Sequence, residues 1–204
     1  MNRPPRLVAV EPDRDTPPSP SSPELSDDAL MGLAQTDPRA FEALVRRHEP
    51  TMRRLATLLI NDPERARELT QDALVLAWER RHKYEPRGQL RAWLGGIVRN
   101  LARRESRRRA LWKLFVRDTP TWTHAESELD PSAALHERDR DRLLAHGLAK
   151  LSAPHREALA FRFVEELDYD TMAELVGTSA STLRSRVHYG LAQLAQHVPE
   201  ELLR

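Results

Sequence analysis

The sequence predicts an all-α protein with two small helical domains joined by a flexible linker. Apolar residues recur at three- and four-residue steps in several long segments, which is the spacing of a helix that buries one face. No long run alternates Val, Ile or Thr with polar residues, and only 5% of the 204 residues are aromatic. The core is therefore expected to consist mainly of Leu, Ala and Val, which suits a helical bundle better than a sheet.

Helix starts define the first domain, which we place at residues 26–112. Ser26 can cap a helix whose first turn is acidic, and Asp37 and Asp62 each precede a proline, an order typical of a first helical turn. His48 lies on the apolar stripe and is interpreted as a residue at the edge of the core. The expected elements are a helix from Ser26, a helix from Pro38, a helix over residues 63–82, a turn over 84–88 and a long helix over about 89–109.

Two segments lack helical periodicity. Residues 1–25 hold seven of the 15 prolines and almost no regular apolar spacing, which predicts a disordered tail. Residues 113–132 include prolines and threonines without a repeating apolar pattern, and they are assigned as the linker. No apolar stretch approaches the roughly 20 residues of a membrane span, and the N-terminal apolar run is too short for a signal peptide.

The second domain is placed at residues 133–198. Four leucines between residues 143 and 151 mark its first long helix. Pro154 starts the next helix, in which Leu159 and Phe163 are expected to face inward.

Residues 168–190 have the pattern of a helix-turn-helix. A short helix over residues 170–176 ends at Gly177, where a left-handed residue commonly terminates a helix, and Ser179 can cap the helix that follows. An Arg- and hydroxyl-bearing outer face suits a major groove, but any helical hairpin with a polar outer face would look similar. The expected inner face carries Leu183, Val187, Leu191 and Leu194, and the outer face carries Ser181, Thr182, Arg184, Ser185 and His188.

The charge is unevenly distributed although the net charge is only +1. Residues 80–117 hold 13 lysines and arginines but only two glutamates, so the rest of the chain is acidic. Such a basic block indicates contact with a polyanion such as nucleic acid, and a solvated helix face is the alternative.

The sequence offers no catalytic or metal-binding pattern. It has no cysteine, which excludes disulfides and thiolate metal sites and favours a reducing cytoplasm. The eight histidines are scattered, and there is neither a phosphate-binding loop nor a plausible nucleophile–base pair. We therefore expect no enzyme activity, no catalytic residue, no cofactor and no metal.

Two stretches resemble the sigma-70 family of RNA polymerase sigma factors, in its extracytoplasmic-function group. The first stretch comprises DPRAFEALVRRH and then ARELTQDALVLAWERRHKYEPRGQLRAWLGGIVRNLARRESRRR, and it is similar to sigma domain 2. The second is LAKLSAPHREALAFRFVEELDYDTMAELVGTSASTLRSRVHYGLAQL, and it is similar to the helix-turn-helix of sigma domain 4. The two stretches occur in the family's order with a linker between them.

The resemblance implies a factor that binds core polymerase, directs it to promoters and helps to melt the −10 element. The polymerase-binding residues would be Glu68, Gln71 and Asp72, facing the β′ clamp helices. The −10 contacts would be Lys83, Tyr84, Arg87, Arg91, Arg99, Asn100, Arg103 and Arg107, with Arg104, Arg108 and Arg109 adding charge. The −35 contacts would be Ser179, Ser181, Thr182, Arg184, Ser185, Arg186 and His188, in a domain that also packs on the β flap.

The resemblance further implies a cytoplasmic protein, associated with the nucleoid when active, and an anti-sigma protein as a partner. Thr171, Ser181 and Tyr189 differ from the residues usual in the family's domain 4. These differences favour one alternative function, that of a sigma-like regulatory protein that binds polymerase or a regulator but recognises promoters weakly.

Overall fold

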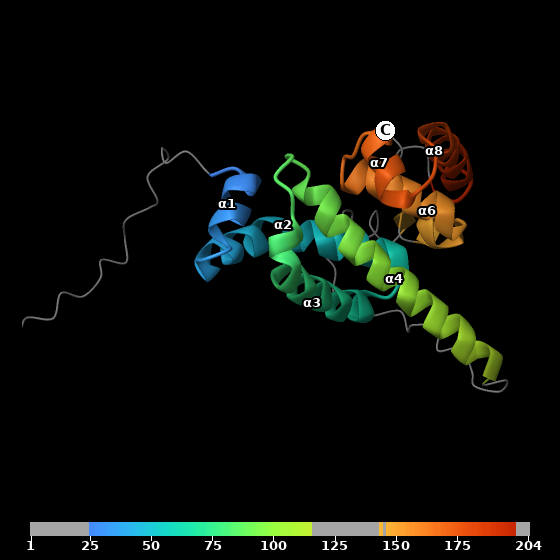
Figure 1. The fold of residues 1–204 in the computed structure, drawn as a ribbon. Helices are drawn as coiled ribbons and strands as arrows, with labels where there is room; N and C mark the ends of the chain where they lie inside the picture. Colours follow the sequence, from blue (N-terminus) through green and yellow to red (C-terminus); the bar gives the residue numbers. More distant parts are fainter. Residues whose placement is uncertain (1–24, 116–142, 145, 199–204) are drawn as a thin grey trace, which may run out of the picture.

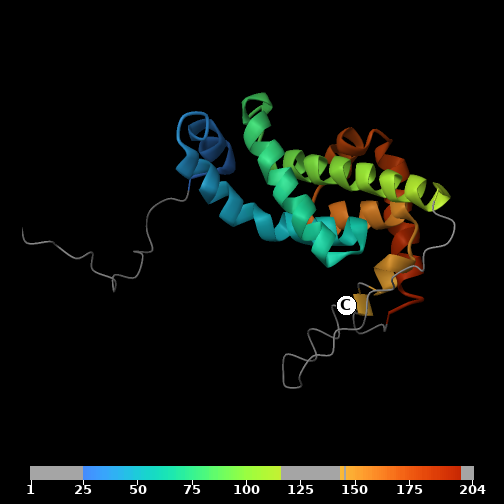
Figure 2. The same ribbon diagram turned by 90° about the horizontal axis from the view of Figure 1, so that it is seen from below.

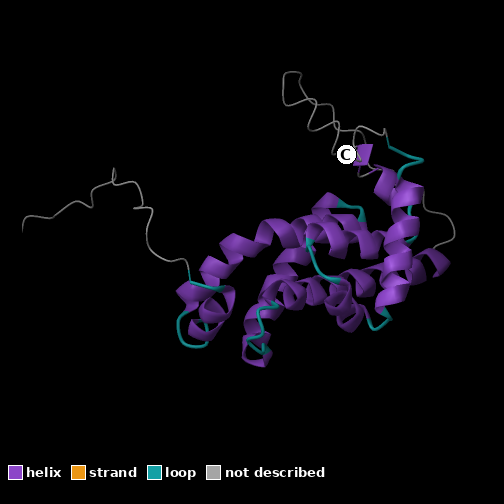
Figure 3. Cartoon of the chain, turned by 90° about the horizontal axis from the view of Figure 1, so that it is seen from above, coloured by secondary structure: helices purple, strands orange, loops and turns teal. Residues whose placement is uncertain are grey.

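A computed structural model describes residues 25–115, 143–144 and 146–198, and these residues form helices joined by short loops, with no strand among them (Figures 1 and 3). Nearly all of the expected tail and linker lies outside the described residues. The N-terminal elements are α1 (Asp27–Leu33), α2 (Pro38–Ile60), α3 (Pro63–Arg80), the 3-10 turn η1 (Arg81–Lys83) and α4 (Leu90–Phe115). The C-terminal elements are α6 (Ala153–Leu159), the π-helical turn η2 (Ala160–Val164), α7 (Tyr169–Val176) and α8 (Ala180–Leu194).

Side-chain caps fix the helix starts as the sequence predicted. Ser26 Oγ accepts the Ala29 N–H at 3.2 Å, and Asp37 and Asp62 accept backbone N–H groups in the first turns of α2 and α3. Each cap satisfies one of the amides that the first helical turn leaves without a partner. Asn61 has a positive φ of 55°, which ends α2 and lets the chain turn directly into α3.

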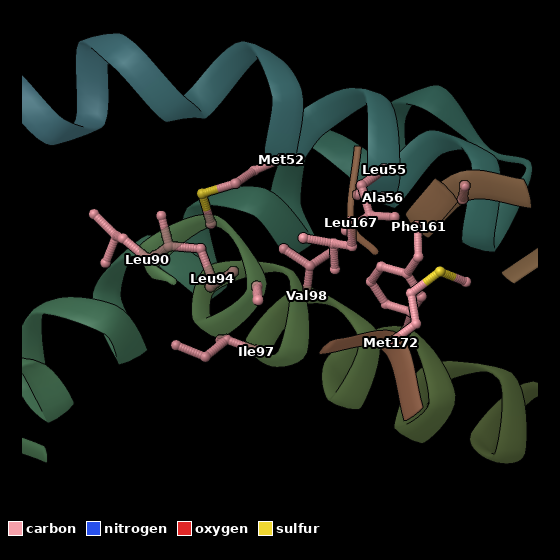
Figure 4. Close-up of a cluster of buried hydrophobic side chains, with 14 of the residues drawn as sticks. Met52, Leu55, Ala56, Leu90, Leu94, Ile97, Val98, Phe161, Leu167 and Met172 are labelled. Atoms are coloured by element: carbon pink, nitrogen blue, oxygen red, sulfur yellow. The ribbon is translucent and has the colours of Figure 1, made fainter. Parts of the chain in front are cut away.

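The first core lies between α2, α3 and α4. Met52 and Leu55 of α2 are fully buried, as are Leu90 and Val98 of α4 (Figure 4). On α3 the buried residues include the small Ala66, Ala73 and Ala77. Burial of such side chains stabilises the fold by about 2 kcal/mol each. α4 continues to at least Phe115, beyond the expected end near Arg109.

Phe163 does not face inward as predicted. It is 56% exposed, and Phe161 is the residue that is fully buried. The reason is the π-helical turn: the Glu165 N–H bonds to Ala160 O, five residues earlier, so one extra residue shifts the side-chain register after Leu159. Counting four residues from Leu159, as in a regular α-helix, therefore predicts that Phe163 is buried, whereas the buried residue is Phe161.

The inner face of α8 also differs from the prediction at one position. Leu183, Val187 and Leu194 are buried as expected, but Leu191 is exposed and Gly190 is buried in its place. A Cβ at Gly190 would lie 3.2 Å from Leu159 Cγ, so α8 approaches α6 closely at this glycine.

The C-terminal helices pack directly against the N-terminal ones. α7 contacts α4, and α6 and η2 contact α2. In Figure 1, α6–α8 lie on one side of α4, and in Figure 2, which is seen from below, α4 overlaps them. Phe161, Leu167 and Met172 from the C-terminal half join the cluster that contains Leu55 and Val98, so one apolar core spans both halves (Figure 4).

Candidate nucleic-acid interface

The predicted polymerase-binding residues lie together on the outer face of α3. Glu68, Gln71 and Asp72 are all exposed, opposite the buried Leu69 and Ala73. Because residues three and four apart share a helix face, these polar groups and the 57%-exposed Val75 form one continuous surface. An acidic rim around an exposed apolar residue is a surface suited to a protein partner.

The turn between α3 and α4 is held by α1. Tyr84 Oη donates a hydrogen bond to the Asp28 carboxylate, which also accepts the Gly88 N–H at 2.8 Å. Burial and the neighbouring Asp28 raise the pKa of Tyr84 above its ordinary value, so the phenol stays protonated. Tyr84 also packs edge-on against Trp93, with ring centroids 5.5 Å apart. Lys83 and Arg87, by contrast, are exposed on this fixed turn.

Part of the basic block neutralises a buried glutamate. Glu105 is buried and receives hydrogen bonds from Arg65, Arg108 and Arg109 at 3.1–3.3 Å, and Arg109 also pairs with Asp62. Burial alone would raise the pKa of Glu105, but the arginine hydrogen bonds outweigh it and hold the pKa below its usual value. Arg108 and Arg109 therefore have a structural role that their sequence positions did not reveal.

The remaining arginines of α4 form two groups. Arg103, Arg104 and Arg107 are exposed beside the exposed Asn100, and none of these arginines has an ion pair within the described part of the chain. Arg91 and Arg99 instead point to the C-terminal half. The structure thus brings together three of the predicted −10 residues, Asn100, Arg103 and Arg107, on one solvent-facing surface and places Arg91 and Arg99 at an internal contact.

Arg99 is only 5% exposed. Its Nε donates to Glu157 Oε1 of α6 at 2.5 Å, and its two terminal nitrogens donate to the carbonyls of Leu175 and Val176 at 3.2 Å. These carbonyls close α7, where a cation is favoured by the helix dipole. No local sequence pattern indicates this contact, because Glu157 lies 58 residues further along the chain.

Arg91 makes the second polar contact between the halves. Its Nη2 donates to Val164 O at 2.9 Å and its Nη1 pairs with the exposed Glu166 at 3.1 Å. Glu165, 3% exposed, lies 3.7 Å from Arg91 Nε. Burial raises the pKa of Glu165 to about 7, against a smaller opposing effect of Arg91 and with a further increase from Glu166.

The Glu165→Gln variant is expected to become more stable relative to the wild type as the pH rises from 4.5 to 7. The quantity compared is the free energy of unfolding of the two proteins at each pH. The folded-state pKa of about 7 exceeds the ordinary 4.5, so the wild type is stabilised by the bound proton below pH 4.5 and loses that stabilisation as the pH approaches 7. The glutamine stays neutral throughout. Urea unfolding across this window measures the difference, and a difference independent of pH would contradict the prediction.

The outer face of α8 presents most of the predicted −35 residues. Arg184, Ser185 and His188 are exposed, and Arg184 also lies over the Tyr169 ring at 5.1 Å. Ser179 caps the helix by accepting the Thr182 N–H at 3.1 Å. The Ser179 hydroxyl also bonds to those of Ser181 and Thr182, so this group is engaged locally, and Arg186 is half-buried. Tyr189, 60% exposed, adds an aromatic ring to this surface.

The described residues contain no group of three or more His, Asp or Glu side chains that could hold a metal ion. Within the same ranges, none of the helices is both long enough and apolar enough to cross a membrane.

Comparison with known proteins assigns both halves of the chain. The family model Sigma-70 region 2 matches residues 44–111, and Sigma-70, region 4 matches residues 141–194. The ECF RNA polymerase sigma factor SigL of Mycobacterium tuberculosis is 31% identical over 169 residues, which is 81% of this chain and 92% of SigL. SigE of Mycolicibacterium smegmatis is 26% identical, and the match covers 78% of this chain and 62% of SigE.

A solved structure has the same arrangement of helices. The sigma factor RpoE of Bartonella quintana, in complex with the anti-sigma factor NepR, aligns with a TM-score of 0.64 at 26% identity, over 81% of this chain and 97% of that chain. The two matched regions occur in the same order here, on α2–α4 and on α6–α8. The chain therefore belongs to the extracytoplasmic-function group of the sigma-70 family, the sigma factors that direct RNA polymerase to promoters.

Proposed function

We propose that this sigma factor binds core polymerase through the outer face of α3 and contacts the −10 element through the turn and basic surface that follow it. The observation that carries the proposal is the adjacency of two unlike surfaces on one small bundle. The exposed Glu68, Gln71 and Asp72 form an acidic and amide face, and the exposed Arg103 and Arg107 form a basic one. Such a bundle can join a protein partner to a nucleic-acid strand.

The turn over residues 83–88 suits capture of a nucleotide. Tyr84 and Trp93 supply aromatic surface, and Lys83 and Arg87 supply exposed positive charge. Stacking on aromatic rings together with phosphate contacts is how proteins hold single strands. The Asp28 carboxylate accepts hydrogen bonds from both Tyr84 and Gly88, so the turn is already ordered in the free protein. Binding of a strand then costs little further conformational entropy in the turn.

The second DNA contact is assigned to α8. Arg184, Ser185 and His188 face solvent on a helix whose other side is buried, which is the division that a recognition helix requires. The protein is proposed to act by binding rather than by catalysis, in the cytoplasm and at the nucleoid when active. An anti-sigma protein is its expected regulator, as RpoE of Bartonella quintana is bound by NepR.

Run-off transcription with core polymerase, followed by genomic mapping of the bound sites, tests the function directly. We expect discrete start sites that require this protein. Co-purification with polymerase but no discrete start sites would instead support the sigma-like regulatory alternative.

Arg103→Ala with Arg107→Ala is expected to reduce the salt dependence of DNA binding. Each arginine that neutralises a phosphate releases counterions, so removal of two contacts lowers the slope of log affinity against log salt by about 2. Fluorescence anisotropy with a labelled duplex at several salt concentrations gives this slope. Arg46→Ala with Arg53→Ala removes the same charge from α2; an equal change in this control would show a general charge effect and contradict the assignment.

A further inference from the structure

A small cleft between α4 and α6 gathers arginines from two separate parts of the chain. Its cavity volume is about 220 Å³, and its lining includes Arg99, Arg103 and Arg107 of α4 together with Arg156 of α6. The three arginines of α4 are spaced by four residues, so they follow one another along one side of the helix. Basic side chains from two elements therefore converge on one confined space.

Arg99 is the arginine of this cleft whose donors are already used. It bonds to Glu157 at 2.5 Å and to two carbonyls at the end of α7. Within the described ranges of the chain, no hydrogen bond or ion pair engages the guanidinium of Arg103, Arg107 or Arg156. Glu157, the acid in the lining, is thus neutralised by Arg99, and three positive charges remain without a partner in this part of the structure.

Arg156 differs from the other two because it is half-buried, whereas Arg103 and Arg107 are exposed. Burial lowers the pKa of Arg156 from its ordinary value, yet a guanidinium stays charged at neutral pH. A cation that loses water without gaining an acceptor destabilises the folded state, and positive neighbours add to that cost. An anion bound in the cleft would offset both effects.

The size of the cleft and its donors select the class of anion. Pockets for drug-sized ligands have volumes of about 300–1,000 Å³, so a cleft of about 220 Å³ suits a compact group better than a whole nucleotide. Arginine forks match the oxygens of phosphate groups. The exposed Ser106 also lines the cleft and adds a hydroxyl donor. Three guanidinium groups and a hydroxyl suit an anion with several oxygens and more than one negative charge.

We propose that the cleft between α4 and α6 is a binding site for a compact polyphosphate anion, held by Arg103, Ser106, Arg107 and Arg156. Leu59 and Pro154 add apolar surface to the lining, which excludes some water and strengthens the charge interactions. The site goes beyond the proposed function, because Arg156 belongs to neither of the proposed DNA surfaces.

Pyrophosphate is the probe that tests this site. Isothermal titration calorimetry of the full-length chain, at fixed ionic strength and without magnesium, measures the affinity. We expect one pyrophosphate per chain, bound at least about tenfold more tightly than inorganic phosphate or sulfate, because linked phosphoryl groups reach more of the arginines at once. ATP carries the same linked groups on a nucleoside and should bind no more tightly than pyrophosphate.

Substitutions on both walls of the cleft should weaken binding. Arg156→Gln keeps a polar side chain but removes the charge, and it should lower the affinity for pyrophosphate by at least about tenfold, since a hydrogen bond between charged groups is lost. Arg107→Gln, at an exposed position of α4, should have a similar effect and guards against a folding defect at Arg156. Arg156→Lys keeps the charge and should restore part of the affinity.

Arg104→Gln is the matched control. Arg104 is exposed on α4 next to Arg103 but does not line the cleft, so this variant removes the same charge and should bind pyrophosphate as the wild type does. Thermal unfolding followed by circular dichroism gives a second measurement. A ligand that binds the folded state raises Tm, so pyrophosphate should raise the Tm of the wild type and of Arg104→Gln but not that of Arg156→Gln.

Four results would overturn the proposal. Absence of pyrophosphate binding would remove the site, and equal weakening by Arg104→Gln would reveal a general charge effect. Sulfate that binds as tightly as pyrophosphate would indicate an adventitious ion only, and ATP that binds more tightly would place recognition on the nucleoside. None of these measurements depends on promoter recognition, so pyrophosphate binding and the proposed function are tested separately.

Discussion

The double variant Glu68→Lys with Asp72→Lys is expected to abolish co-purification with core RNA polymerase. Both carboxylates are exposed on α3, where Glu68 pairs with Arg65, and the substitutions change no buried residue of that helix. Placing like charges against each other in an interface costs several kcal/mol, so the affinity should fall by roughly a hundredfold or more. Pull-down of polymerase with the tagged variant, together with helical circular dichroism, measures both binding and folding.

A matched control reverses two charges elsewhere. Glu42→Lys with Glu49→Lys makes the same change in net charge on α2, where both carboxylates pair with arginines one turn away. This variant should still bind polymerase. Retained binding by the α3 variant, or equal loss in the control, would remove the assignment of α3 as the docking surface.

The largest stability effect is expected from Phe161→Ala. Phe161 is fully buried in the core shared by both halves, close to Leu55 and Gly95. Truncation of a buried phenylalanine removes its transfer free energy and leaves a cavity, so the free energy of unfolding should fall by about 3–5 kcal/mol. Denaturant unfolding followed by circular dichroism gives this value.

Phe163→Ala is the control within the same π-helical turn. Phe163 is more than half exposed, and surface truncations usually change stability by no more than about 0.5 kcal/mol. Equal losses from the two variants would show that the π-helical turn does not set the register described above. A much larger loss at Phe161 would confirm that register.

Much of the fold could be predicted from sequence because its signals are local. Ser26, Asp37 and Asp62 start helices by bonding to amides only two or three residues away, and Gly177 ends α7 with a φ of 73°. Such contacts depend on neighbouring residues alone. The exposure of Glu68, Gln71 and Asp72 could be predicted in the same way, since a helix that buries Leu69 and Ala73 must turn those residues outward.

The errors and omissions arose where packing or an irregular turn, rather than regular helical spacing, decides the outcome. The positions of Phe161 and Phe163 depend on one five-residue hydrogen bond that no periodic pattern reveals, and the burial of Gly190 in place of Leu191 depends on the approach of α6. Glu105 looked like an interruption of a basic block, yet it is the buried anion that organises three arginines. The Arg65–Glu105 bond joins residues 40 positions apart, and the π-helical bond, although local, interrupts the regular helical spacing on which the prediction depended.

The helix starts, the order of the two matched regions and the exposed face of α3 could thus be predicted from the residues alone, because capping and periodicity act within one or two helical turns. The core shared by the two halves, and the burial of Arg99 against Glu157 while Arg103 stays exposed, became evident from the packing of the helices. The sequence shows how many lysines and arginines α4 carries, but the packing of the helices sets which of them stay exposed to water. A buried arginine needs acceptors such as Glu157 to replace the water that it loses.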